Sequence, residues 1–272
     1  MAMELAQQSG APANQKMDVV LNNLSLRYRG SNGDYEKAKL LLECAAAIRV
    51  EAGGTDNPAL AVTLGNLAGV YKEHHEYARA ESLYKRAIEI SDGAPKPNHM
   101  ETELYLFGLA TVYEAEGRAV DAEPLYARGL EISEQAFGHD DPMVAAKLDR
   151  FASFYQRQRS YGQAESLYVR SLSIQEKVYG TNFPGLSTTL NELGKIYSAD
   201  GKVALAEQTF KRSLTILEAG PYPNRFDLAN ALSGLASTYR AQGKHTEAEK
   251  LESRAASIRA TLPANNPRRT IP

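Results

Sequence analysis

The sequence has little cysteine, no long apolar run and almost no net charge, and each shortage excludes a class of protein. Its one cysteine, Cys44, cannot form a disulfide within the chain, so we expect a cytoplasmic protein. No stretch approaches the about 18 apolar residues of a membrane span, and the N-terminus lacks the basic start and apolar core of a secretory signal. The 31 basic and 33 acidic side chains give no basic footprint for nucleic acid. Neither membrane nor nucleic acid is an expected partner.

Motifs for catalysis and metal binding are also missing from the sequence. Glycine-rich phosphate loops and the HxxxH and CxxC spacings of metal sites do not occur. His74 and His75 share one turn, and His139 precedes two aspartates; we interpret both groups as hydrated turn residues. No histidine lies near Cys44 in the sequence, which favours a packed thiol over a nucleophile. The sequence therefore predicts a protein that is not an enzyme, with no catalytic residue, no metal and no cofactor.

What the sequence does contain is a repeat of 42 residues. A tyrosine, an alanine followed by glutamate, and an arginine recur in phase. The tyrosines are Tyr71, Tyr113, Tyr155, Tyr197 and Tyr239, the glutamates Glu81, Glu123, Glu165, Glu207 and Glu249, and the arginines Arg86, Arg128, Arg170, Arg212 and Arg254. We expect the glutamates and arginines to form scaffold salt bridges or a solvated outer face. A repeat of this length indicates stacked units that bury their apolar faces against one another.

Each unit has the pattern of two helices and a link. In the second unit, apolar residues recur at helical spacing over 64–71 and again, after a polar turn, over 77–88. The links TDNP, GHDDP and TNFP place proline at the start of the next helix, where its missing N–H costs nothing. Small residues such as Gly194 would let the two helices approach, and large ones such as Phe210 would fill the space to the next unit. Pro124 falls within a second helix and predicts a kink rather than a break.

These residues resemble the tetratricopeptide repeat family. The resemblance is carried by Leu67, Ala68 and Tyr71, then Ala80, Tyr84 and Ala87. The period of 42 residues is similar to that of the kinesin-light-chain-like subclass. The resemblance covers about residues 18–262 and implies an all-α fold, a right-handed superhelical solenoid of six helix-turn-helix repeats. It also implies a non-enzymatic scaffold that binds a protein or an extended peptide in a concave groove lined by the first helices.

The chain is therefore expected to comprise a disordered segment, 1–16, the solenoid, 17–262, and a disordered tail, 263–272. The repeats are expected at about 17–56, 57–97, 98–140, 141–182, 183–223 and 224–262. In the sixth unit Glu252 and Ala256 replace the large apolar residues of the other units. Polar or small residues there would close the array.

The groove residues are predicted by counting from the repeat tyrosine. Positions −6, −5, −2, +1 and +2 lie opposite the packing face of the first helix. In the resembling subclass, asparagines at −6 and −5 hold the main chain of a peptide, since an amide both donates and accepts hydrogen bonds. The predicted peptide-binding residues are Asn22, Asn23, Asn66, Lys72, Phe107, Arg150, Arg157, Asn191, Lys195 and Arg240.

Charge on this face favours an acidic ligand. Six basic residues oppose four acidic ones, namely Arg29, Lys72, Arg150, Arg157, Lys195 and Arg240 against Glu73, Glu114, Asp149 and Glu192. Phe107 would be a large apolar side chain on an open face and is expected to contact the ligand. The other residues of this face could instead be solvated helix residues that bind nothing. A self-assembling structural scaffold is the alternative function, although we expect a monomer.

Overall fold

The computed structural model describes residues 17–30, 34–95, 98–220 and 224–262, and its regular structure there is entirely α-helical. Twelve helices are found in these ranges. They are α2 (Met17–Gly30), α3 (Tyr35–Gly53), α4 (Pro58–Glu73), α5 (Tyr77–Gly93), α6 (His99–Ala115), α7 (Ala119–Phe137), α8 (Pro142–Arg157), α9 (Tyr161–Tyr179), α10 (Leu186–Ala199), α11 (Val203–Ala219), α12 (Arg225–Ala241) and α13 (His245–Ala260). The all-α prediction is confirmed for the described chain.

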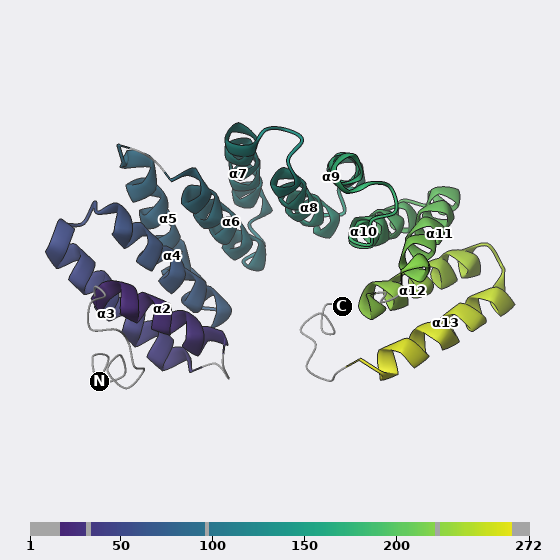
Figure 1. Cartoon of the computed structure of the whole chain (residues 1–272), viewed down its shortest axis with the longest axis horizontal. Helices are drawn as coiled ribbons and strands as arrows, with labels where there is room; N and C mark the ends of the chain where they lie inside the picture. The colour runs from purple at the N-terminus through teal and green to yellow at the C-terminus, as the bar shows by residue number, and fades with distance from the viewer. Residues whose placement is uncertain (1–16, 31–33, 96–97, 221–223, 263–272) are drawn as a thin grey trace. The chain divides into compact units, whose positions relative to one another are not determined.

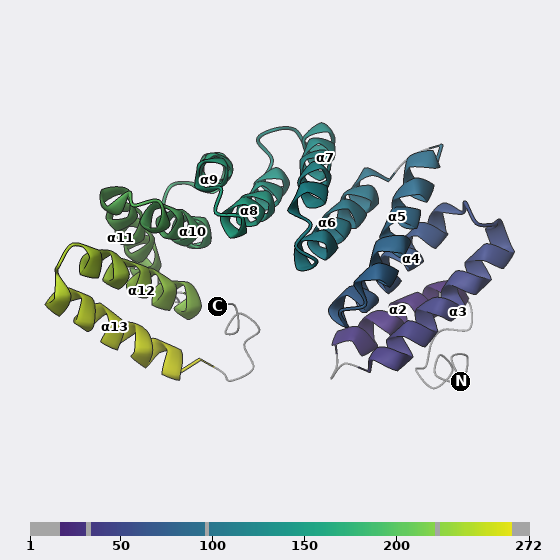
Figure 2. The ribbon, with the colours of Figure 1, turned by 180° about the vertical axis from the view of Figure 1, so that it is seen from behind.

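Within each half of the chain, consecutive helices pack as hairpins, and successive hairpins pack on one another. In the first half of the chain, α4 lies against α5, and α5 lies against α6 (Figure 1). The first helices of neighbouring hairpins also touch, α4 with α6 and α10 with α12. From behind, α12 and α13 again lie side by side as one hairpin (Figure 2). This stacking of hairpins is a helical-repeat solenoid.

The chain forms two compact units, residues 1–136 and residues 137–272. The first contains α2 to α7 and the second contains α8 to α13, with the last residue of α7 at the boundary. The right-handed superhelical sense and the repeat boundaries stay predictions, and the segments predicted to be disordered, 1–16 and 263–272, lie outside the described residues.

Helix starts follow the link chemistry in two of the three proline-bearing links. Before α4 the Asn57 side chain accepts a hydrogen bond from the Ala59 amide at 3.0 Å, and before α8 Asp141 caps the Met143 amide at 2.7 Å. Each cap satisfies an N–H group that has no partner within its helix. The link TNFP differs from its prediction, because α10 begins only at Leu186 and has no side-chain cap.

Aromatic residues of the second helices fill the space between hairpins, as the sequence predicts. The Phe210 ring on α11 is 1% exposed and lies against two glycines, Gly194 on α10 and Gly234 on α12. A Cβ atom added to either glycine would come closer than 3.0 Å to that ring. Tyr84 on α5 packs over Gly108 of α6 in the same way. Glycine at these positions therefore makes room for the ring of a neighbouring helix.

The predicted scaffold salt bridges are present at the repeated glutamate and arginine positions. Glu81 is paired with Lys85 at 2.7 Å and with Arg118 of the next hairpin at 3.0 Å. Arg86 is paired with Asp56, in the link before its own hairpin, at 2.6 Å. Exposed pairs of this kind contribute about 0–1 kcal/mol each, so they fix the positions of links more than they stabilise the fold.

The structure shows where four individually predicted residues lie. The α7 helix continues through Pro124 without a break. Cys44 packs against the apolar core of α2 and α3. At the sixth hairpin Ala256 is exposed and Glu252 is half-buried, and Glu252 forms an ion pair with Arg240 of α12.

Candidate binding surface of the first helices

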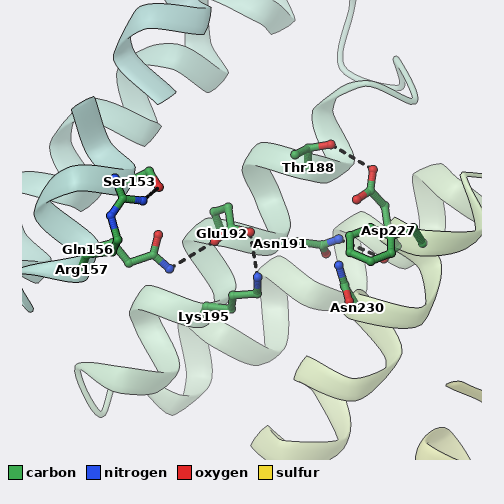
Figure 3. Close-up of a pocket in the computed structure, with 10 residues that line it drawn as sticks. Ser153, Gln156, Arg157, Thr188, Asn191, Glu192, Lys195, Asp227 and Asn230 are labelled. Atoms are coloured by element: carbon green, nitrogen blue, oxygen red, sulfur yellow. Dashed lines mark hydrogen bonds and ion pairs between the residues drawn. The ribbon is translucent and has the colours of Figure 1, made fainter. Parts of the chain in front are cut away.

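In the second unit, three successive first helices enclose a cavity of about 730 Å³ (Figure 3). The helices are α8, α10 and α12. The lining residues are Ser153, Gln156, Arg157, Thr188, Asn191, Glu192, Lys195, Phe226, Asp227 and Asn230. Three residues predicted from the sequence, Arg157, Asn191 and Lys195, are among them. The structure thus brings together part of the predicted surface.

Charged side chains at the cavity are paired with one another. Lys195 Nζ lies 2.7 Å from Glu192 Oε1, and Gln156 donates to the other Glu192 oxygen at 3.2 Å (Figure 3). Arg157 donates to the Ser153 hydroxyl one turn earlier at 2.7 Å. Both cations are substantially exposed, so an incoming anion can reach them. The carboxylate of Glu192 competes with that anion for Lys195.

A buried carboxylate forms the α12 side of the cavity. Asp227 is 4% exposed, and its Oδ2 accepts hydrogen bonds from Thr188 at 2.9 Å and from Asn224 at 2.7 Å. The Asn191 amide donates to the Asp227 carbonyl oxygen at 3.0 Å. These bonds join α10 to α12 and fix the relative positions of two walls of the cavity.

The residues at position −6 are turned toward the second helix of their own hairpin. This corrects the prediction that Phe107 lies on an open face, whereas Asn191 reaches the cavity lining but is largely buried. Phe107 is 1% exposed, and its ring packs edge-to-face on Tyr126 and over Gly129, both on its own second helix, α7. Asn191 is 2% exposed and accepts a hydrogen bond from Ser213 of its own second helix at 2.8 Å. Position −6 faces the partner helix of the hairpin, so Phe107 is a core residue and the Asn191 amide is engaged within the fold.

The remaining predicted residues of the first unit are placed differently. Asn22 is 7% exposed, and its side-chain oxygen accepts a hydrogen bond from Asn66 at 3.0 Å, which links α2 to α4. Asn23 is exposed. Lys72 is half-buried and donates to Thr111 of α6 at 3.2 Å. Asn22 and Asn66 therefore form a bridge between first helices.

Two predicted arginines lie on the first helices of the second unit but outside the cavity lining. Arg150 is exposed on α8. Arg240 forms two hydrogen bonds with Glu252, which occupies the position of the aromatic residue in the four preceding hairpins. Its charge is therefore used within the last hairpin.

Seven of the ten lining residues are not among the predicted peptide-binding residues. Ser153, Gln156 and Glu192 lie at the counted positions −2, +1 and −5, whereas Thr188, Phe226, Asp227 and Asn230 lie outside them. These last four occupy positions −9, −12 and −13 relative to the repeat tyrosine. These positions continue the stripe of −5, −2 and +2 by further helical turns toward the N-terminus of each first helix. Extending the count by two turns would have found them.

One ionisable side chain next to the cavity has an unusual environment. Asp149 on α8 accepts hydrogen bonds on Oδ2 from Thr189 at 3.3 Å and from Gln175 at 3.4 Å. Its Oδ1 is shielded from solvent and has no hydrogen-bond partner. Burial, together with the negative charge of Glu192, raises the pKa of Asp149 to about 6.

Within the described ranges, no group of three or more His, Cys, Asp or Glu side chains is placed to hold a metal ion. None of the described helices is long and apolar enough to cross a membrane.

The packing of paired helices through small and aromatic residues defines a helical-repeat scaffold. Comparison with family models gives the family: a tetratricopeptide repeat model matches residues 17–92 and 143–219, more than half of the chain, and a second one matches residues 108–142 and 228–267. The chain belongs to the tetratricopeptide repeat family, whose members are protein-interaction scaffolds. Comparison with curated proteins gives no significant match.

Solved structures with the same fold come from several bacterial and fungal systems. BtubC (BKLC) from P. vanneervenii is 24% identical, with 88% of this chain and 97% of that chain covered and a TM-score of 0.71. A kinesin light chain candidate from Podosopora anserina with nearly identical TPR-like repeats is 22% identical, with 75% and 96% covered and a TM-score of 0.65. PilW, a type IV pilus biogenesis factor, is 16% identical, with 91% and 96% covered and a TM-score of 0.63. At these identities the likeness shows the fold alone.

Proposed function

We propose that this chain is a non-enzymatic scaffold that binds an extended, acidic segment of a partner protein at the cavity of α8, α10 and α12. The observation that carries the proposal is the cavity itself, which opens between three successive first helices and presents Arg157 and Lys195. A rigid, preformed site leaves most of the ordering cost of binding to the ligand. The cytoplasmic location and the monomeric state stay predictions from the sequence.

The chemistry of the lining supports a peptide over a small apolar ligand. Most lining side chains are hydroxyl, amide or charged groups, and Phe226 at the start of α12 is the one aromatic residue among them. Asn230 contributes an amide that can both donate to a peptide C=O and accept from a peptide N–H. Lys195 and Arg157 would contact acidic side chains, since a carboxylate can replace the partners that each now has.

Charge reversal at the cavity tests this proposal. Binding of a fluorescein-labelled peptide of ten alternating glutamate and serine residues is measured by fluorescence anisotropy. Lys195→Glu and Arg157→Glu should each weaken binding about tenfold, equivalent to about 1.4 kcal/mol, and added salt should weaken binding to the unmodified protein. Lys250→Glu, an exposed reversal on α13, is the matched control and should have little effect.

Two outcomes would overturn the proposal. Equal weakening by Lys250→Glu would indicate a general charge effect rather than a site. Binding that is unchanged in both cavity variants would place the ligand elsewhere. Light scattering at several concentrations addresses the alternative of a self-assembling scaffold, which requires a mass that grows with concentration.

A further inference from the structure

The Asp149 carboxyl group is an ionisable group at a position where the hairpin does not require one. The corresponding positions in the other hairpins from α4 onward are Gly65, Phe107, Asn191 and Ser233, none of which is ionisable. At the Asn191 position the side chain has two close hydrogen bonds, at 2.8 and 3.0 Å. Asp149 accepts two long hydrogen bonds, from Thr189 and Gln175, and Ser171 of α9 also stabilises its ionised form, but its Oδ1 has no partner. A buried polar atom without a partner is uncommon in folded proteins and requires an explanation.

The group lies directly behind the cavity wall. Ser153, one helical turn after Asp149 on α8, lines the cavity. Thr189, which donates to Asp149, is the neighbour of the lining residue Thr188 on α10. The carboxyl group thus sits between the two helices whose side chains form the charged part of the cavity.

Ionisable groups of three helices lie near Asp149 in the second unit. From α9, Tyr168 interacts with it, and from α10, Glu192 does. On α8 itself Lys147 and Arg150 flank it in the sequence, and Arg157 lies two turns further along. Glu192 is a like charge and also lines the cavity. The cavity lining contains two carboxylates, Glu192 and Asp227, and no histidine. Behind the wall, Asp149 changes charge in mildly acidic solution, because burial raises its pKa to about 6.

Charge couples Asp149 to an acidic ligand through Glu192. Without ligand, Lys195 neutralises Glu192 at 2.7 Å. A ligand carboxylate that pairs with Lys195 draws the cation away from Glu192 and adds a negative charge of its own. Both changes disfavour an ionised Asp149 and favour its protonated form.

We propose that Asp149 is a proton-linked regulator of the cavity, which binds an acidic peptide tightly when Asp149 is protonated and weakly when it is ionised. The inference rests on the proposed function, because it concerns the same ligand and the same cavity. By linkage, the ligand must in turn increase the affinity of Asp149 for its proton. No conformational change is needed, since the coupling is electrostatic.

The experiment measures binding of the same glutamate–serine peptide between pH 7.5 and pH 5. The unmodified protein should bind about fivefold more tightly at the lower pH, the lower end of typical coupling between two sites. Asp149→Asn, which is uncharged at every pH, should bind at both pH values about as tightly as the unmodified protein does at pH 5. A peptide of alternating lysine and serine is the control and should not gain affinity as the pH falls.

Carboxyl ¹³C NMR of Asp149 in the free and peptide-saturated protein gives a readout that does not depend on a variant. The pKa of Asp149 should be higher in the complex. Peptide binding that is independent of pH, or an Asp149 titration that the peptide does not move, would overturn the linkage and leave the proposed function standing. Absence of peptide binding at every pH would instead overturn the proposed function, and the linkage with it.

Discussion

The packing of Phe210 against two glycines predicts how a glycine-to-alanine substitution changes the free energy of unfolding, because its two opposing contributions have known sizes. In Gly234→Ala the new methyl group on α12 would enter the space of the Phe210 ring on α11. The ring has little room to move, because its tip also lies against Gly194 of α10, where an added Cβ would be 2.7 Å from the ring. Overpacking of this kind costs about 1–3 kcal/mol. The higher helix propensity of alanine returns at most about 1 kcal/mol. We expect a net loss of about 1–2 kcal/mol.

The assay is urea denaturation followed by circular dichroism, with Gly162→Ala as the matched control. Gly162 lies near the start of α9 and is exposed, and nothing lies within 4 Å of an added Cβ there. That variant should be as stable as the unmodified protein, or more stable by up to about 1 kcal/mol. The same chemical change thus has opposite signs at the two positions.

A second substitution separates steric conflict from other causes. Phe210→Leu removes the ring that the new methyl group would meet. The double variant Phe210→Leu, Gly234→Ala should therefore lose less free energy of unfolding than the two single variants lose together, by more than about 0.5 kcal/mol. If Gly234→Ala is no less stable than Gly162→Ala, the ring is not confined as the structure shows it and the reasoning fails.

Two further predictions concern buried charges. Asp149→Asn should stabilise the fold at pH 7.5 by up to about 3 kcal/mol, because the folded-state pKa of about 6 exceeds that of the unfolded chain. Because the pKa of Asp149 is raised on folding, the folded state of the unmodified protein binds more protons than the unfolded state. The unmodified protein should therefore lose stability as the pH rises from about 4 through 6. Urea midpoints of the two proteins that change in parallel with pH would contradict this. Arg49→Met should cost about 2–3 kcal/mol, because Arg49 is 7% exposed and is paired with Asp18 at 2.8 Å and with Thr63 at 2.6 Å. A urea midpoint within about 0.5 kcal/mol of the unmodified protein would refute it.

The architecture could be predicted from the sequence because the residues of each packing contact recur in several repeats. One aromatic residue opposite one small residue is weak evidence, but the same pair at a constant interval is strong. The repeat tyrosines, the glutamates and the arginines all occupy scaffold positions for that reason. The exception is the start of α10, where the link contains the same residue types but the helix begins later, at Leu186.

The candidate site was predicted only in part, because helical phase was resolved too coarsely. One residue along a helix corresponds to a rotation of about 100°, so positions −6 and −5 point in different directions. At −6, Phe107 and Asn191 contact the second helix of their own hairpin, and Asn191 reaches the cavity only as a buried side chain, whereas at −5 the side chain of Glu192 lines the cavity. The burial of Phe107 depends on Gly129, a small residue 22 positions later in the sequence. Comparing the residues at these two repeat positions across all units would have assigned Phe107 to the core.

Counting charges on a helix face also overstates what a ligand can gain. Of the predicted cations, Lys195 is paired with Glu192, and Arg240 is paired with Glu252. An acidic ligand therefore exchanges one carboxylate partner for another at Lys195, and its net gain depends on what happens to Glu192 after the exchange. Gln156 already donates to Glu192 and can remain there. The affinity for acidic ligands should thus depend on the energetic cost of leaving Glu192 without Lys195. Under the proposed linkage, the protonation of Asp149 behind the same cavity wall lowers this cost.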